Sequence, residues 1–239
     1  MASEEAAPPV VRERYGPLVH RSVRHGAIVW IVAVVEFLVG MIITQIGYGS
    51  SYSLTQNYIS DLGAVNCGPL SGREVCSPWH LVFNISIVVF GLLILLGTIL
   101  LRTGFPPRST RTVGLALLVI ASVGAIGVGL SPEDVNITVH SLSAATAFVA
   151  GNLALIVLGF AMFRDTRWDG FRAYSILSGL IGLVAFFLFV AKVYGPLGVG
   201  GMERLIVAPV LLWALVCGIH LGRIPTYAPP GVHPSPQRS

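Results

Sequence analysis

Long runs of apolar residues, separated by short polar connections, dominate the pattern along the chain. Six of these runs are long enough to cross a bilayer, which takes about 20 helical residues. They cover residues 26–46, 79–101, 112–130, 138–162, 172–191 and 205–221. Small residues recur inside them, and small residues let membrane helices approach closely. The pattern predicts an all-α integral membrane protein, a bundle of six transmembrane helices.

Polar, proline-rich stretches flank this apolar region at both ends of the chain. We expect residues 1–25 and 223–239 to be flexible cytoplasmic tails, which leaves residues 26–222 as one membrane domain. The longest connection within that domain, residues 47–78, is expected to be an external loop. The first apolar run is too long for the core of a signal peptide, and no small-residue cleavage site follows it. The glycine-rich stretch at residues 198–201 predicts a flexible turn before the sixth helix.

Composition and charge add an orientation to this picture. Only 11% of the residues are charged and the mean hydropathy is +0.79, whereas soluble domains carry about 25% charged residues. Threading six helices puts twelve of the fifteen Lys and Arg residues on one side and leaves Arg73, Lys192 and Arg204 on the other. The positive-inside rule then predicts a plasma-membrane protein with both termini in the cytoplasm. No Lys/Arg cluster interleaves with aromatic residues, which argues against nucleic-acid binding.

One polar, turn-rich segment, Gln56–Cys76, interrupts the apolar pattern, and we call it the lid. The threading places it outside the cell, in an oxidising compartment. Cys67 and Cys76 lie nine residues apart within it, so we predict a disulfide, with two free thiols as the alternative. Zinc binding by this pair is less favoured because no second Cys/His pair lies near it in sequence. Cys217, in the sixth run, is expected to be a small buried apolar residue.

Ionisable side chains are costly inside membrane helices and usually face the protein interior or a wet cavity. Most polar groups of this kind fall in the lid or at the outer ends of helices. They are Ser60 and Asp61 in the lid, His80 and Asn84 in the second helix, His140 in the fourth, and Glu203 and Arg204 in the sixth. Glu36 differs, because it lies near the middle of the first helix and needs a partner or a proton there. Together these positions predict an outward-facing polar cavity under the lid.

Each polar group also has a purely structural interpretation. His80 is a candidate interfacial anchor beside Trp79, and Asp61 a candidate turn cap. Glu36 is a candidate for a structural hydrogen bond within the bundle. The remaining candidates are Glu133 and Asp134 as a solvated acidic loop, and Glu203 and Arg204 as a local ion pair.

Three functions fit this arrangement. The first is the binding or handling of a lipid-like amphiphile, with Ser60, Asn84, Glu203, Arg204 and Glu36 as binding residues. The second is a membrane-embedded hydrolase with Asp61, His80 and His140 as catalytic residues, which would also be the ligands of any metal ion. The third is a non-catalytic helper subunit or a proton-coupled carrier. The sequence identifies no cofactor, and the partner that it predicts is the lipid bilayer.

Three motifs carry a resemblance to a known family. They are "SLTQNYISDLGA" (Ser53–Ala64), "GLSPEDVNITVHSLSA" (Gly129–Ala144) and "GVGGMERLIVAPVLLW" (Gly198–Trp213). Together they resemble the bacterial membrane proteins grouped as domain of unknown function 998, over roughly residues 28–222. The resemblance implies a six-helix membrane protein without an established activity. It also implies that the polar residues of the motifs form one site, namely Ser60, Asp61, His140, Glu203 and Arg204.

A more distant likeness is to the alkaline-ceramidase-like membrane hydrolases, which place Ser, Asp and several His residues around zinc. This sequence lacks their full set of histidines. Arg outnumbers Lys fourteen to one and Ala, Gly and Val are abundant, a composition typical of high-GC bacteria.

Overall fold

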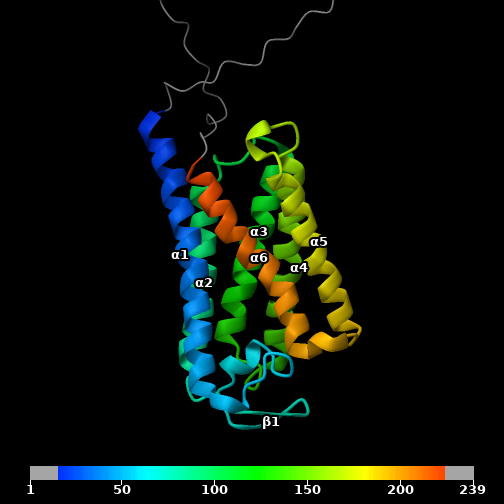
Figure 1. Cartoon of the computed structure of the whole chain (residues 1–239). Helices are drawn as coiled ribbons and strands as arrows, with labels where there is room; N and C mark the ends of the chain where they lie inside the picture. The colour runs from blue at the N-terminus through cyan, green and yellow to red at the C-terminus, as the bar shows by residue number, and fades with distance from the viewer. Residues whose placement is uncertain (1–15, 224–239) are drawn as a thin grey trace, which may run out of the picture.

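The protein folds as a bundle of six long helices (Figure 1). The structure, a computed structural model, describes residues 16–223. The helices are α1 (Gly16–Tyr48), α2 (His80–Leu100), α3 (Ser109–Leu130), α4 (Ile137–Ala161), α5 (Phe171–Val190) and α6 (Gly198–Leu221). All six are long and apolar enough to cross a membrane, in agreement with the predicted all-α six-span bundle. Most of the two predicted tails lies outside the described residues.

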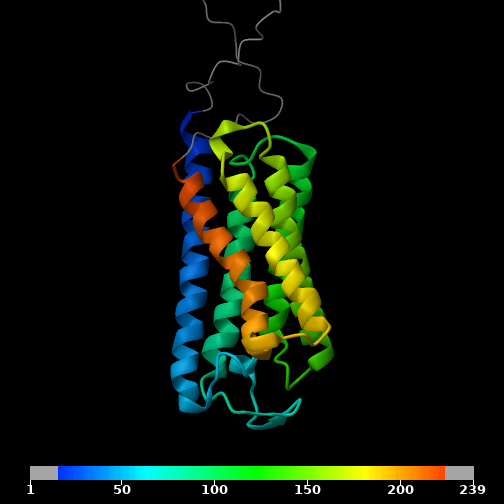
Figure 2. The ribbon, with the colours of Figure 1, turned by 45° about the vertical axis from the view of Figure 1, so that its right-hand side comes forward.

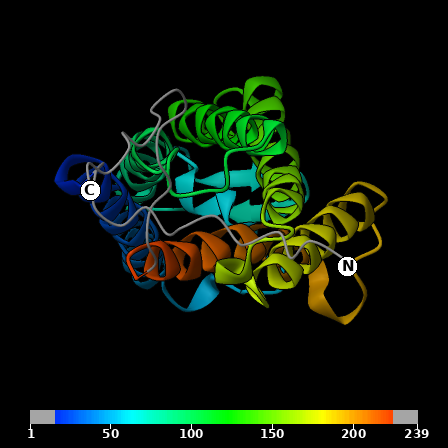
Figure 3. The same cartoon turned by 90° about the horizontal axis from the view of Figure 1, so that it is seen from above.

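Five of the helices surround the interior of the bundle. From α1 to α4 each helix packs against the next, and α6 returns to pack against α1 and close the ring. The remaining helix, α5, packs on the outside against α4 and α6. Figure 3 shows this ring from above, with the segment between α1 and α2 visible across its far end.

The two ends of the bundle differ in what they carry (Figures 1 and 2). One end, which we call the loop end, carries the α1–α2, α3–α4 and α5–α6 connections, and the first of these contains the lid. The opposite end, which we call the terminal end, carries the α2–α3 and α4–α5 connections and both ends of the described chain. An even number of spans requires this arrangement, because each span crosses the bundle once.

Two helices begin earlier than the apolar pattern predicts. The helix α1 begins at Gly16, and Arg21 and Arg24 lie on its exposed side. The prediction of a flexible turn at residues 198–201 is wrong, because these residues form the first turn of α6. Their glycines serve close packing there: a Cβ at Gly200 would overlap the carbonyl oxygen of Asn57 in the lid.

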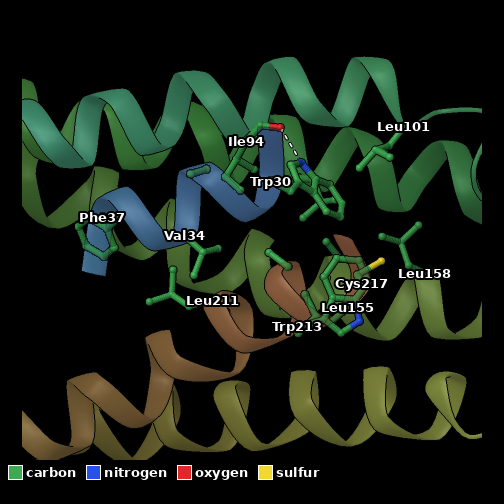
Figure 4. Close-up of a cluster of buried hydrophobic side chains, with 14 of the residues drawn as sticks. Trp30, Val34, Phe37, Ile94, Leu101, Leu155, Leu158, Leu211, Trp213 and Cys217 are labelled. Carbon is green, nitrogen blue, oxygen red and sulfur yellow. Dashed lines mark hydrogen bonds between the residues drawn. The ribbon is translucent and has the colours of Figure 1, made fainter. Parts of the chain in front are cut away.

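Aromatic side chains fill the terminal half of the bundle. The rings of Trp30 on α1 and Trp213 on α6 lie 5.7 Å apart, and both side chains are fully buried (Figure 4). Each indole N–H is satisfied: Trp30 donates to the carbonyl of Ile94 at 3.1 Å, and Trp213 donates to Ser175 Oγ at 2.7 Å. A buried indole with its donor satisfied is a rigid packing element, so this cluster closes the interior of the ring toward the terminal end.

Candidate functional site

The lid is a compact structure built on two short elements. Its first half forms a single helical turn, η2 (Ser60–Gly63), and its second half forms a hairpin of β1 (Gly68–Leu70) and β2 (Arg73–Val75). A disulfide joins Cys67 and Cys76 directly beyond the Gly68–Val75 pair, as predicted. The bond closes the hairpin at its base and leaves η2 to face the bundle.

Asp61 anchors the lid from within and is completely buried. Its Oδ1 accepts a hydrogen bond of 2.8 Å from Arg73 Nη2, and its Oδ2 accepts from Arg73 Nε, Asn57 Nδ2 and the amide of Tyr58. Burial acts to raise the pKa of Asp61, but the hydrogen bonds from Arg73 and Asn57 outweigh it and lower the pKa. A carboxylate has about four acceptor positions, so Asp61 is an ionised structural group with its acceptors already used.

Glu133 lies in the α3–α4 connection and faces the lid rather than solvent. It is only 6% exposed; Oε2 accepts a hydrogen bond of 2.9 Å from Ser60 Oγ, while Oε1 lies 3.6 Å from Arg73 Nη2. Burial and then the adjacent Asp61 raise the pKa of Glu133 to about 8. The hypothesis of a solvated acidic loop is therefore wrong for this residue, which is a buried carboxyl that holds its proton at neutral pH.

The neighbouring Asp134 holds the segment of the lid between η2 and β1. It accepts hydrogen bonds from the amides of Val65 and Asn66 at 2.8 to 3.1 Å, and from the side chain of Asn66 at 2.8 Å. Burial acts to raise the pKa of Asp134, but these donors lower it below the ordinary value. Both acidic residues of the connection thus bind the lid, whereas one interpretation of the sequence placed them in a solvated loop.

On α6, Glu203 and Arg204 contact the lid separately. Glu203 Oε2 accepts a hydrogen bond from the amide of Ile59. Arg204 Nη1 donates to the carbonyls of Leu54, Asn57 and Gly200 at 2.9 to 3.0 Å, and its Nη2 donates to the hydroxyl of Tyr52. Within residues 16–223 the two side chains form no ion pair with each other, contrary to the structural interpretation of a local pair.

The polar residues of α2 and α4 complete the loop end. Asn84 Nδ2 donates to the carbonyl of Gly63 at 2.9 Å, so it holds the end of η2. His80 is half-buried at the start of α2, and its Nδ1 lies 3.0 Å from the carbonyl of Ser77. His140 is buried, and its Nδ1 lies 2.9 Å from the carbonyl of Ser131. The two histidines therefore fix the starts of their own helices.

These positions bear on the predicted metal centre. Among the described residues, no three His, Cys, Asp or Glu side chains lie close enough together to hold one metal ion. Asp61, His80 and His140 accordingly do not form the ligand set that the hydrolase hypothesis requires. Asp61 is paired with Arg73, and the Nδ1 atom of His80 is hydrogen-bonded to the carbonyl of Ser77.

Glu36 is separate from the other predicted site residues. It lies on α1 with Ser86 of α2 as its polar neighbour. Its Oε2 is buried and has no hydrogen-bond partner in the described part of the chain. Glu36 does not line the cavity described next, so the structure does not bring it together with Glu203 or Ser60.

A cavity of about 100 Å³ lies inside the ring, beneath the lid. Ile59 and Ser60 of the lid line it at the loop end, and Trp30 and Trp213 line it at the other end. Along α6 from Glu203 to Trp213, these ends are roughly 15 Å apart. Apart from the two indoles, the polar side chains in its wall are Ser60, Ser122, His140 and Glu203. The cavity is thus long and apolar, with its ionisable groups at the lid.

The size and lining of the cavity determine what it can contain. A site holding one water molecule needs only about 10–15 Å³ together with two to four polar partners. This cavity is several times larger, and along most of its length its wall is Phe, Ile, Leu, Val and Ala. Cavities with such walls stay dry and accept apolar molecules. The site therefore suits an apolar chain that ends in one polar group.

A family model described as "Protein of unknown function (DUF998)" matches residues 31–220. No curated protein and no solved structure matches the chain. The matched region contains the lid, the α3–α4 connection and the start of α6, and therefore the polar end of the site.

Proposed function

Since the chain belongs to the DUF998 family, whose description states no activity, we propose its function from the cavity itself: the protein binds a lipid-like amphiphile. The hydrocarbon chain lies inside the ring of α1, α2, α3, α4 and α6, and the polar group lies under the lid beside Glu203. The observation that carries the proposal is the apolar cavity that ends at buried ionisable groups.

The energetics of a cavity of this size support this function. Side chains around a void lose dispersion contacts, and in cores the cost grows with cavity volume, at about 24 cal/mol per Å³. Alanines line this cavity on three helices, with Ala121 on α3, Ala147 on α4 and Ala214 on α6. Larger apolar residues at these positions would fill the space, whereas alanine preserves it. A hydrocarbon chain that occupies the cavity restores the lost contacts.

The orientation that we propose places the loop end at the outer face of the plasma membrane. Nine of the twelve described Lys and Arg residues lie in sequence toward the terminal end, and three belong to the loop end. Of those three, Arg73 and Arg204 donate hydrogen bonds to residues of the lid, and Lys192 is the exposed one. This strengthens the positive-inside argument. The amphiphile then reaches the cavity from the outer leaflet.

Mass spectrometry of co-purified lipids tests the proposal. The protein is purified in a mild detergent as wild type, as Val207→Phe and as Val216→Phe. Val207 lines the cavity, whereas Val216 lies on the same helix with 40% of its surface exposed and does not line it. We expect a bound amphiphile in wild type and Val216→Phe and its loss from Val207→Phe. Equal lipid content in all three proteins would contradict the function.

A further inference from the structure

The polar end of the cavity contains a carboxyl group without a counterion. Glu203 is 6% exposed and lines the cavity. Within residues 16–223, its one hydrogen bond comes from the amide of Ile59, and no Lys, Arg or His lies within ion-pair distance. Buried carboxylates are normally paired with a cation or a metal ion. The part of the chain that the structure describes provides no such partner for Glu203.

The nearby guanidinium groups are committed elsewhere. Arg204 directs its Nη1 to three backbone carbonyls and its Nη2 to the hydroxyl of Tyr52. Arg73 forms its ion pair with Asp61 at 2.8 Å. Lys192 is exposed in the α5–α6 connection. A cation that pairs with Glu203 must therefore come from outside the described chain.

The other polar groups at this end of the cavity also offer acceptors. His140 uses Nδ1 toward the carbonyl of Ser131, which requires Nδ1 to carry the proton. Its Nε2 is then a free acceptor in the neutral ring, for which the described residues supply no partner. The hydroxyl of Ser60 donates a hydrogen bond to Glu133, so the lone pairs of its oxygen remain available as acceptors. Three acceptors, one of them a carboxyl, match a polar group that carries several donors.

We propose that the amphiphile is a long-chain amine, held by its protonated amino group. This inference rests on the proposed function. An alkylammonium presents three N–H donors and one positive charge, which matches Glu203, His140 and Ser60. Its hydrocarbon chain extends from Glu203 along α6 toward Trp30 and Trp213. A fatty acid would place a second carboxyl beside Glu203, and an alcohol would leave the carboxyl without a cation.

The two tryptophans at the far end of the cavity report binding directly. Bromine at the end of an alkyl chain quenches indole fluorescence on contact, so ω-bromododecylamine, ω-bromododecanol and ω-bromododecanoate serve as probes. They are added to the full chain in lipid nanodiscs. A Trp79→Phe background removes an exposed indole that probes dissolved in the bilayer would reach. The part of the quenching that is present in wild type and absent in Val207→Phe measures occupancy of the cavity.

We expect the amine to quench at lower concentration than the alcohol or the acid. Glu203→Gln retains the shape of the side chain and an acceptor for Ile59 but removes the charge. It should weaken binding of the amine about tenfold or more, because charge-assisted hydrogen bonds are roughly twice as strong as neutral ones. Binding of the alcohol should change little. Glu203→Asp keeps the charge and should keep the preference for the amine, even where it lowers stability.

The remaining outcomes separate the two proposals. Equal quenching by all three probes, lost in Val207→Phe, would overturn the amine and leave amphiphile binding intact. Stronger quenching by the acid than by the amine would likewise overturn the amine and leave amphiphile binding intact. Quenching that is identical in wild type and Val207→Phe for every probe would overturn both proposals.

Discussion

Ser60 donates a hydrogen bond of 2.9 Å to Glu133, and this pair joins the lid to the α3–α4 connection. The residues on either side of Ser60 contact different elements: Ile59 donates to Glu203 on α6, and Asp61 accepts from Arg73 on β2. Ile59 and Ser60 thus tie the lid to two separate parts of the fold, while Asp61 joins η2 to the hairpin within the lid. Because Ile59 and Ser60 also line the cavity, the stability of the lid and access to the cavity depend on the same contacts.

The raised pKa of Glu133 predicts a pH-dependent stability. Its pKa is about 8 in the folded protein, against an ordinary value of 4.5. Between these values the folded state binds a proton that the unfolded state releases, so the free energy of unfolding falls as pH rises. Glu133→Gln cannot ionise and should remove this decline. The lowered pKa of Asp61 acts in the opposite sense, but only as pH falls through values below 3.8.

The measurement is thermal unfolding in detergent at a series of pH values through this window. As pH rises, Tm should fall more steeply in wild type than in Glu133→Gln. At this chain length, a change of 1 kcal/mol in the free energy of unfolding shifts Tm by roughly 2–4 °C. Glu74→Gln is the matched control, because Glu74 is an exposed carboxyl on β2. If Glu133→Gln and wild type show the same slope, Glu133 does not hold the proton.

A methyl group on Gly200 should displace the lid. A Cβ at this position would overlap the carbonyl oxygen of Asn57 and lie 2.8 Å from that of Leu54. Both are backbone atoms that also accept from Arg204, so they cannot move without losing these bonds. We expect Gly200→Ala to lower stability by about 1–3 kcal/mol, the usual cost of overpacking. Thermal unfolding and proteolysis of the lid both measure the effect.

The adjacent glycine provides the control. In Gly201→Ala the new Cβ meets only the side chain of Leu197, at 3.2 Å. Alanine also favours the helix by up to about 1 kcal/mol, so this variant should be as stable as wild type or slightly more stable. Equal losses in both variants would show that helix geometry, rather than packing of the lid, accounts for the effect.

Much of the fold could be predicted from the sequence because the membrane restricts which residues a span can contain. A span must be apolar throughout, so the six runs appear in composition alone. The start of α6 was missed because Gly198–Gly201 are poor helix formers, and only their contact with the lid explains them. The first turn of α6 thus packs against the lid, a contact between segments that are distant in sequence.

The site was predictable only in part, because its contacts are distant in sequence. Ser60, Asp61, His140 and Glu203 were expected at one end, since each begins a helix or lies in the lid on the same side of the threading. Glu133 was not expected, because an acidic pair in a short connection usually faces solvent. Its partner Ser60 is 73 positions away. Local sequence carries no information about such a pair, and burial of Glu133 follows from that pairing.

The disulfide predicts a simple pattern of thiol reactivity. The chain has three cysteines, of which Cys67 and Cys76 are bonded and Cys217 is free and buried. Alkylation of the denatured, unreduced protein should therefore modify Cys217 alone, and reduction should expose the other two. Mass spectrometry counts the modified sites. Modification of Cys67 and Cys76 without reductant would contradict the bond.

Removing the disulfide should loosen the lid without unfolding the bundle. For a loop this short, chain entropy gives a stabilisation of about 2–3 kcal/mol. The double variant Cys67→Ser, Cys76→Ser should become sensitive to protease within Gln56–Cys76, while the six helices remain intact. Cys217→Ala is the control and should keep the lid resistant. Resistance in the double variant would show that Asp61 and Asp134 hold the lid by themselves.

The orientation in the membrane predicts which end of the bundle reacts from outside the cell. In a Cys217→Ala background, a single cysteine is placed at Gln56 in the lid or at Ser109 at the start of α3, both of which are exposed. Intact cells are treated with a membrane-impermeant maleimide. Because the arginines lie mainly toward the terminal end, we expect Gln56→Cys to react on intact cells. Ser109→Cys should react only after the membrane is permeabilised. The reverse pattern would place the lid, and with it the entrance to the cavity, in the cytoplasm.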